Sequence, residues 1–156
     1  MENIKYLNQD LAVLIGQPSV AELQQAAKAG FKSVLNLRAP QEEDFCSDEQ
    51  QSAEVAGLNY VNIPLRPDLL SDELIDQILT QIDQLPKPIL THCKTGLRAV
   101  TAGLMYIATR EGMTAEAAFA KGEELGFNYD DKPRMKQFLP NYIATHSKSS
   151  VQHNKI

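Results

Sequence analysis

The sequence predicts an α/β fold, in which a mainly parallel sheet of four to five strands is flanked by helices. Up to Arg98, short apolar runs alternate with helical patterns, which is typical of a parallel sheet covered by helices on both faces. After Arg98 only helical patterns follow. With 156 residues, the chain is long enough to bury a core as one domain.

The first half of the chain predicts three strands and two helices. The strands come from short aliphatic and β-branched runs. Ser19 and Glu22 form a capping box at the start of the first helix, and Gly30 stops that helix. Ser47 and Gln50 form a second capping box, which predicts a short acidic helix ending at Gly57. The predicted strands are Leu11–Ile15, Ser33–Leu37 and Tyr60–Ile63.

The second half predicts one strand and four helices. Ser71 caps an amphipathic helix whose apolar positions continue to Leu85, where Pro86 ends it. The fourth strand is Ile89–Thr91. The remaining helical patterns run from Arg98 to about Arg110, from Thr114 to about Leu125, and from about Pro133 to Tyr142.

Residues 1–146 are expected to form a single domain, followed by a polar tail, residues 147–156, that is expected to be disordered. The net charge of −5 argues against nucleic acid as a partner. Neither a membrane-spanning apolar run nor a signal peptide is recognisable, so a cytoplasmic location is expected. No cofactor or metal is expected, because His146 and His153 lack the spacing of metal ligands.

The loop from His92 to Arg98 carries the most chemical information. Cys93 would leave a buried strand and Arg98 would open a helix, so several backbone N–H groups and the positive end of the helix dipole would meet beside a thiol. Such a thiol is expected to ionise to the thiolate. A thiolate in an anion-binding loop with an arginine beside it points to attack on phosphorus or sulfur held as an oxyanion.

Within this loop, Lys94, Thr95, Gly96 and Leu97 are expected to bind the anion mainly through their backbone N–H groups. Cys93 is the expected nucleophile, and Arg98 is expected to grip the oxyanion with two parallel hydrogen bonds. His92 allows two interpretations: it supports ionisation of the thiol by hydrogen bonding to nearby backbone, or it is a buried histidine with partners of its own.

Other charged residues follow neighbouring strands and would meet the loop at one edge of the sheet. Asp68 is the best candidate for the general acid, although a solvated turn aspartate after Pro67 is the plainer interpretation. Arg38 and Arg66 would enlarge a positive rim. Cys46 lies among acidic residues, which should make it less reactive, and it could serve as a resolving thiol only if the fold brings it near Cys93.

The pattern His-Cys-x-x-Gly followed by arginine resembles the signature of the cysteine-dependent phosphatases, especially the dual-specificity group. More closely, three segments together resemble a bacterial family described as the phosphatase-like domain of β-lactamase-hydrolase-like proteins. These segments are Gly16-Gln17-Pro18-Ser19, Asn36-Leu37-Arg38 and Cys93 to Arg98. The resemblance implies a dual-specificity-phosphatase-like fold and a small anionic substrate or a phosphorylated protein. Fusion to a metallo-β-lactamase-type domain in some relatives implies a partner enzyme of that kind.

The function expected from these features is hydrolysis of phosphomonoesters through a phosphocysteine intermediate. Two departures from the phosphatase pattern keep a second function open. Four residues separate Cys93 from Arg98, where the phosphatases have five, and Ala99 stands where they usually have Ser or Thr. A spacing of four resembles the rhodaneses, which implies a sulfurtransferase that carries a persulfide on Cys93. A third alternative is an anion-binding or partner-docking domain without catalysis.

Overall fold

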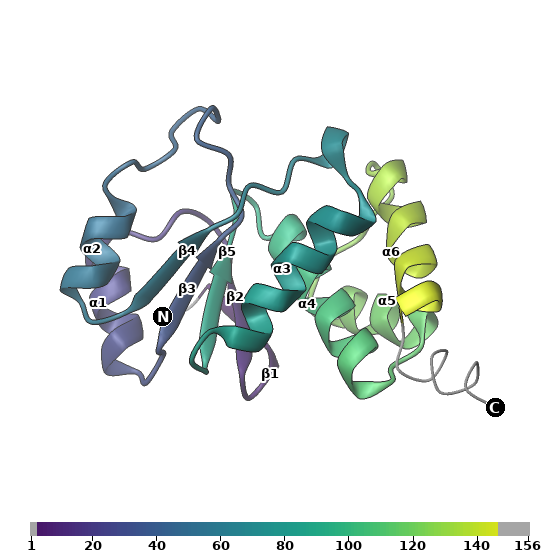
Figure 1. The fold of residues 1–156 in the computed structure, drawn as a ribbon, viewed down its shortest axis with the longest axis horizontal. Coiled ribbons are helices and arrows are strands. Elements are labelled where there is room, and N and C mark those ends of the chain that lie inside the picture. The colour runs from purple at the N-terminus through teal and green to yellow at the C-terminus, as the bar shows by residue number, and fades with distance from the viewer. Residues whose placement is uncertain (1–2, 147–156) are drawn as a thin grey trace.

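The computed structural model describes residues 3–146, which form a five-stranded sheet in the order β1-β2-β5-β3-β4. The strands β2 (Leu11–Leu14), β5 (Ile89–His92), β3 (Ser33–Asn36) and β4 (Asn59–Asn62) are parallel, as predicted. Figure 1 shows helices on both sides of this sheet. The predicted α/β class is therefore confirmed.

A fifth strand, β1 (Ile4–Asn8), pairs antiparallel with β2 at the sheet edge and was not predicted from the sequence. Its residues are mostly half-buried, and polar side chains are mixed with apolar ones. An edge strand is specified largely by the hydrogen bonds of its neighbour, so its own sequence carries little periodic signal. The upper end of the predicted range of four to five strands is therefore correct.

Two layers of helices cover the sheet. On one face, α1 (Val20–Lys28) and α2 (Glu49–Val55) pack on a small apolar cluster that includes Leu14, Val34 and Leu90. The other face carries a larger cluster. Four longer helices build it: α3 (Asp72–Gln84), α4 (Leu97–Glu111), α5 (Ala115–Glu124) and α6 (Pro133–His146).

Most predicted helix starts are confirmed. Ser19 forms the full capping box with Glu22, and the Ser71 hydroxyl accepts a hydrogen bond from Leu74 N–H. The capping box predicted at Ser47 is wrong: α2 begins at Glu49, and its N-terminal neighbour Asp48 makes no side-chain cap. The predicted capping partner Gln50 instead donates its side-chain amide to Glu54 at 3.4 Å, within the helix.

The strand register places the chemistry-bearing residues. Asn36 lies opposite both Asn62 and His92, and Leu14 also lies opposite His92, so four parallel strands end at the same level. The segments that follow these strands meet at this edge, as expected for a parallel sheet. Between β4 and α3, a short 3₁₀ turn η1 (Pro67–Leu69) carries Asp68 to the same edge.

The predicted polar tail, residues 147–156, lies outside the described residues. Among residues 3–146, no helix is both long and apolar enough to cross a membrane.

Candidate active site

The loop between β5 and α4 is built around Cys93 and Gly96. Gly96 is the N-cap of α4 and has a φ of 97°, a left-handed conformation that glycine adopts without strain. Its backbone N–H donates a hydrogen bond to Cys93 Sγ at 3.2 Å. A Cβ at this position would lie 3.1 Å from the Phe127 ring. The glycine therefore allows a backbone amide to face the sulfur while Phe127 packs against the loop from outside.

Cys93 lies at the base of this loop and exposes no surface to solvent. The loop residues Lys94 and Thr95 are exposed above it. Arg98, on the first turn of α4, interacts electrostatically with Cys93. The predicted nucleophile and the predicted anion-binding arginine are thus neighbours, and the sulfur is covered rather than open to bulk water.

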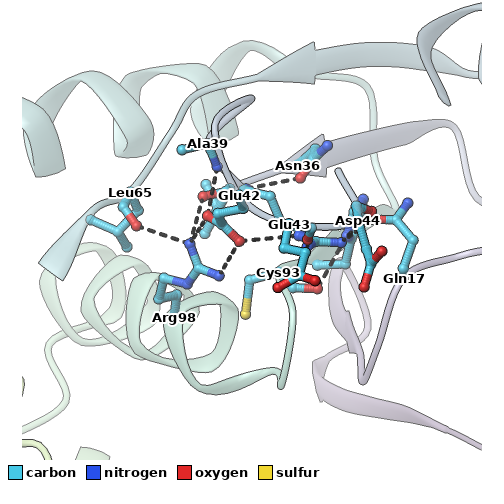
Figure 2. A network of polar contacts seen from close by, with 12 residues as sticks. Gln17, Asn36, Ala39, Glu42, Glu43, Asp44, Leu65, Cys93 and Arg98 are labelled. Carbon is cyan, nitrogen blue, oxygen red and sulfur yellow. Dashed lines mark hydrogen bonds and ion pairs between the residues drawn. The ribbon is translucent and has the colours of Figure 1, made fainter. Parts of the chain in front are cut away.

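Arg98 is held by a residue that the sequence analysis missed. Its Nη1 and Nη2 donate to the Glu42 carboxylate at 2.6 and 3.0 Å, and Nη1 also reaches the carbonyl of Leu65 at 3.3 Å (Figure 2). Burial opposes the charged form of Arg98, but the Glu42 hydrogen bond and Cys93 outweigh it, so the pKa of Arg98 is raised above its usual value. The guanidinium is consequently both charged and fixed in orientation.

Glu42 is itself tightly bound. It accepts hydrogen bonds from Arg38 Nε at 3.1 Å and from Ala39 N–H at 2.7 Å. The Arg98 hydrogen bond, assisted by those from Ala39 and Arg38 and opposed by burial, lowers the pKa of Glu42 to about 2. The only sequence signal was the spacing of four between Arg38 and Glu42, which does not reveal a contact with Arg98.

Arg38 lies beneath the site, not on its rim as expected. Its side chain is almost completely buried and donates to Gln17 Oε1 and to the Glu43 carbonyl, both at 2.7 Å. Every polar atom of a buried guanidinium needs a partner, and the acidic loop after β3 folds around Arg38 to provide them. Arg38 therefore supports Glu42 and does not contact the open pocket.

His92 is fully buried and has a partner of its own. Its Nε2 lies 2.5 Å from Glu49 Oε2, and the other Glu49 oxygen accepts from Gln17 Nε2, also at 2.5 Å. The structure shows an element of each interpretation of His92: Nε2 has a buried partner of its own in Glu49, and Nδ1 contacts the backbone carbonyl of Cys93 at 3.5 Å. Glu49 was not predicted as a site residue, because it is 43 positions from His92 in sequence.

These contacts join into one polar network around the loop, drawn in part in Figure 2. It runs from His92 through Glu49, Gln17, Arg38 and Glu42 to Arg98. Both ends of the network flank Cys93 in sequence. The position of the cysteine loop is therefore coupled to the loops that follow β2 and β3.

A pocket of about 680 Å³ opens above this arrangement. Its walls come from the loops that follow β3, β4 and β5, together with the start of α6. The lining residues are Ala39, Gln41, Glu42, Arg66, Pro67, Asp68, Lys94, Thr95, Leu97, Arg98, Lys132 and Met135. The pocket thus has Arg98 in its wall, with Cys93 beneath the loop that bounds it.

Asp68 lies in the pocket wall, where a general acid would be needed, but it is paired with Arg66. Arg66 Nη2 and Nε donate to the two Asp68 oxygens at 2.8 and 3.3 Å. This hydrogen bond lowers the pKa of Asp68. The general-acid role of Asp68 therefore stays a prediction, and it requires Asp68 to part from Arg66.

Among residues 3–146, no group of three or more His, Cys, Asp and Glu side chains could hold a metal ion. Cys46 and Cys93 form no disulfide: both thiols are free, and Cys46 is partly exposed whereas Cys93 is buried.

The fold is shared with solved phosphatases. A DUF442 protein from Shewanella putrefaciens CN-32 superposes with a TM-score of 0.80 at 20% identity, covering 93% of each chain. TpbA from P. aeruginosa, solved in complex with pTyr, has a TM-score of 0.71 at 18% identity, covering 91% of this chain and 90% of its own. The fold and the cysteine loop thus define a phosphatase-like α/β protein.

Sequence comparison narrows the class to a family. Residues 3–109 match the family described as Beta-lactamase hydrolase-like protein, phosphatase-like domain, and the chain belongs to it. A Beta-lactamase hydrolase-like protein from Xylella fastidiosa (strain Temecula1) is 30% identical over 125 residues, which is 78% of this chain and 29% of that protein. The chain therefore spans less than a third of the length of the curated relatives it matches. The predicted family is confirmed.

Proposed function

We propose that the protein is a cysteine-dependent hydrolase of phosphomonoesters. The observation that supports this most is the placement of Arg98: it adjoins Cys93, lines the pocket, and is held by two hydrogen bonds to Glu42. A guanidinium fixed before substrate arrives can stabilise the charge that develops on a transferring phosphoryl group.

The reaction would take place in two steps. In the first, the Cys93 thiolate attacks phosphorus, the ester bond breaks, and the leaving oxygen takes a proton from Asp68. In the second, Asp68 accepts a proton from water, the water oxygen attacks phosphorus, and the thiolate leaves. Arg98 and the backbone N–H groups of Lys94, Thr95, Gly96 and Leu97 would bind the phosphoryl oxygens in both steps.

For this mechanism the substrate must change the contacts of Asp68. The pair with Arg66 keeps the carboxylate ionised, so a leaving group entering the pocket has to draw Arg66 away or separate the two. Both side chains are exposed, and an exposed ion pair contributes little to stability because water screens it. Substrate binding can therefore separate them at small cost.

The substrate class is an anion, either a small organic phosphate or a phosphorylated protein. TpbA binds pTyr in a fold of the same kind, which supports a phosphate ester as the substrate here. The comparisons do not support the expected metallo-β-lactamase-like partner enzyme, which stays a prediction, as does the cytoplasmic location.

A rhodanese-like sulfurtransferase is the second candidate, and two observations favour it. The loop has four residues between Cys93 and Arg98, and Asp68 is held in its ionised form. Sulfur transfer from thiosulfate needs no proton donor: the Cys93 thiolate attacks the outer sulfur, sulfite leaves with the bonding electrons, and a persulfide remains.

Two assays separate these candidates. Release of p-nitrophenol from p-nitrophenyl phosphate at pH 5 to 7 is expected from the wild type and not from Cys93→Ser. Cys46→Ser is the matched control and should keep full activity, because Cys46 lies in the segment before α2, outside both the cysteine loop and the pocket lining. A persulfide on Cys93 after incubation with thiosulfate, detected by intact mass, combined with no Cys93-dependent ester hydrolysis, would replace the hydrolase by the sulfurtransferase.

A further inference from the structure

The cations of the pocket fall into two groups. Arg98 and Arg66 are neutralised by carboxylates of the same pocket, Glu42 and Asp68. Lys94 and Lys132 also line the pocket, and neither ammonium group has an ion-pair partner among residues 3–146. Two positive charges in the pocket are therefore left without a counter-charge from the protein.

The positive charge of these two lysines is opposite in sign to the net charge of the whole chain. The net charge is −5, so the average field of the protein repels anions, and a local positive excess must act at the pocket itself. In the proposed mechanism, Arg98 and the backbone N–H groups of the cysteine loop already bind the phosphoryl group. Lys94 lies in that loop, whereas Lys132 lines the pocket from the segment that directly precedes α6.

The pocket is also larger than one phosphoryl group requires. Its volume of about 680 Å³ falls within the range of about 300–1,000 Å³ that holds an organic ligand of drug-like size. Leu97, Met135 and Pro67 give it an apolar lining as well. A substrate that fills this space can therefore contact these apolar side chains and Lys132 as well as the cysteine loop.

We infer that the pocket selects organic phosphates that carry a second anionic group, bound by Lys132 and Lys94, in addition to the phosphoryl group at Cys93. This inference rests on the proposed function, since it assigns the substrate class of the same site. A carboxylate and a second phosphate share the chemistry that the two ammonium groups recognise. The apolar side chains in the same lining fit a carbon framework that joins the two anions.

The test measures binding by calorimetry to Cys93→Ser, which binds the substrate without turning it over. The ligands are phenyl phosphate, 4-carboxyphenyl phosphate and 1,4-phenylene bisphosphate, at low salt. The two ligands with a second anionic group are expected to bind about 3–10-fold more tightly than phenyl phosphate, the range expected for one or two partly exposed ion pairs. Comparison of the carboxylate with the bisphosphate shows which second anion the pocket prefers.

The matched variants are Lys132→Gln and Lys136→Gln, each made in the Cys93→Ser background. Lys132→Gln should reduce the preference for the two ligands with a second anionic group over phenyl phosphate at least 2-fold. Lys136 is an exposed lysine one turn further along α6 that does not line the pocket, so its variant should keep the preference.

The outcomes distinguish this inference from the proposed function. If phenyl phosphate binds and the second anion adds no affinity, or if Lys132→Gln keeps the full preference, the inference is overturned and the proposed function survives. If none of the three phosphates binds, the proposed function itself fails.

Discussion

Replacing Glu42 by Gln tests how the anion-binding arginine is held. Glu42 binds both Nη atoms of Arg98, together with Arg38 Nε and Ala39 N–H. A glutamine keeps the shape but has one acceptor oxygen, and its amide nitrogen would face donors. Arg98 would lose its two-point anchor, and the buried Arg38 would lose its charged partner.

The magnitude follows from the pKa of Glu42, which falls from 4.5 to about 2. At about 1.4 kcal/mol per pKa unit, this shift corresponds to at most about 3 kcal/mol. The Glu42 side chain is 23% exposed, so solvent screening reduces the contribution to about 1–2 kcal/mol. We expect Glu42→Gln to lower the melting temperature by about 2–8 °C at pH 7, and to lower kcat/KM by about 10–100-fold because Arg98 is no longer aligned.

The direction of the Glu42 pKa shift determines how its contribution to stability changes with pH. Because the pKa of Glu42 is lower in the folded state, its contribution is fully present above the unfolded value of 4.5 and is lost as pH falls towards about 2. The stability difference between wild type and Glu42→Gln, measured by urea unfolding, should therefore shrink from pH 5 downwards. Glu43→Gln changes an exposed neighbouring carboxylate and is the control. A difference that stays constant with pH, or equal losses in both variants, would refute the reasoning.

Three further predictions concern the loop and the acid. Gly96→Ala should destabilise the fold by at least about 1–2 kcal/mol in thermal unfolding, because its φ of 97° disfavours a side chain and the Phe127 ring lies 3.1 Å from the new Cβ; unchanged stability would contradict the loop geometry. Arg98→Lys should lower kcat/KM about 10²–10³-fold, since lysine cannot make the two-point contact, and near-normal rates would remove Arg98 from the mechanism. Asp68→Asn should slow hydrolysis of alkyl phosphates about 10²–10⁴-fold but that of p-nitrophenyl phosphate much less, because p-nitrophenolate leaves without a proton. Equal effects on both esters would assign the acid elsewhere.

Much of the fold could be predicted because local signals agreed with the tertiary structure. The strands at 11–14, 33–36 and 89–92 are continuous apolar or β-branched runs, and the caps at Ser19 and Ser71 mark real helix starts. The edge strand β1 was missed because its pairing with β2 specifies it more than its own sequence does.

The site could be predicted only in part. The cysteine loop is contiguous in sequence, so Cys93, Gly96 and Arg98 were identified together. Glu42 and Glu49 act through contacts 56 and 43 residues away, which no local pattern reveals. The sequence analysis treated this segment only as acidic surroundings of Cys46, whereas the fold turns Glu42 towards Arg98 and Glu49 towards the buried His92 imidazole.

The most direct test of the account is selective alkylation of the two cysteines by iodoacetamide at pH 6, mapped by mass spectrometry with and without inorganic phosphate. A nucleophilic sulfur that shares its loop with a bound oxyanion predicts that Cys93 reacts faster than the more exposed Cys46, and that phosphate slows only Cys93. If Cys93 stays unmodified, or if phosphate does not protect it, the loop is not a reactive anion-binding site.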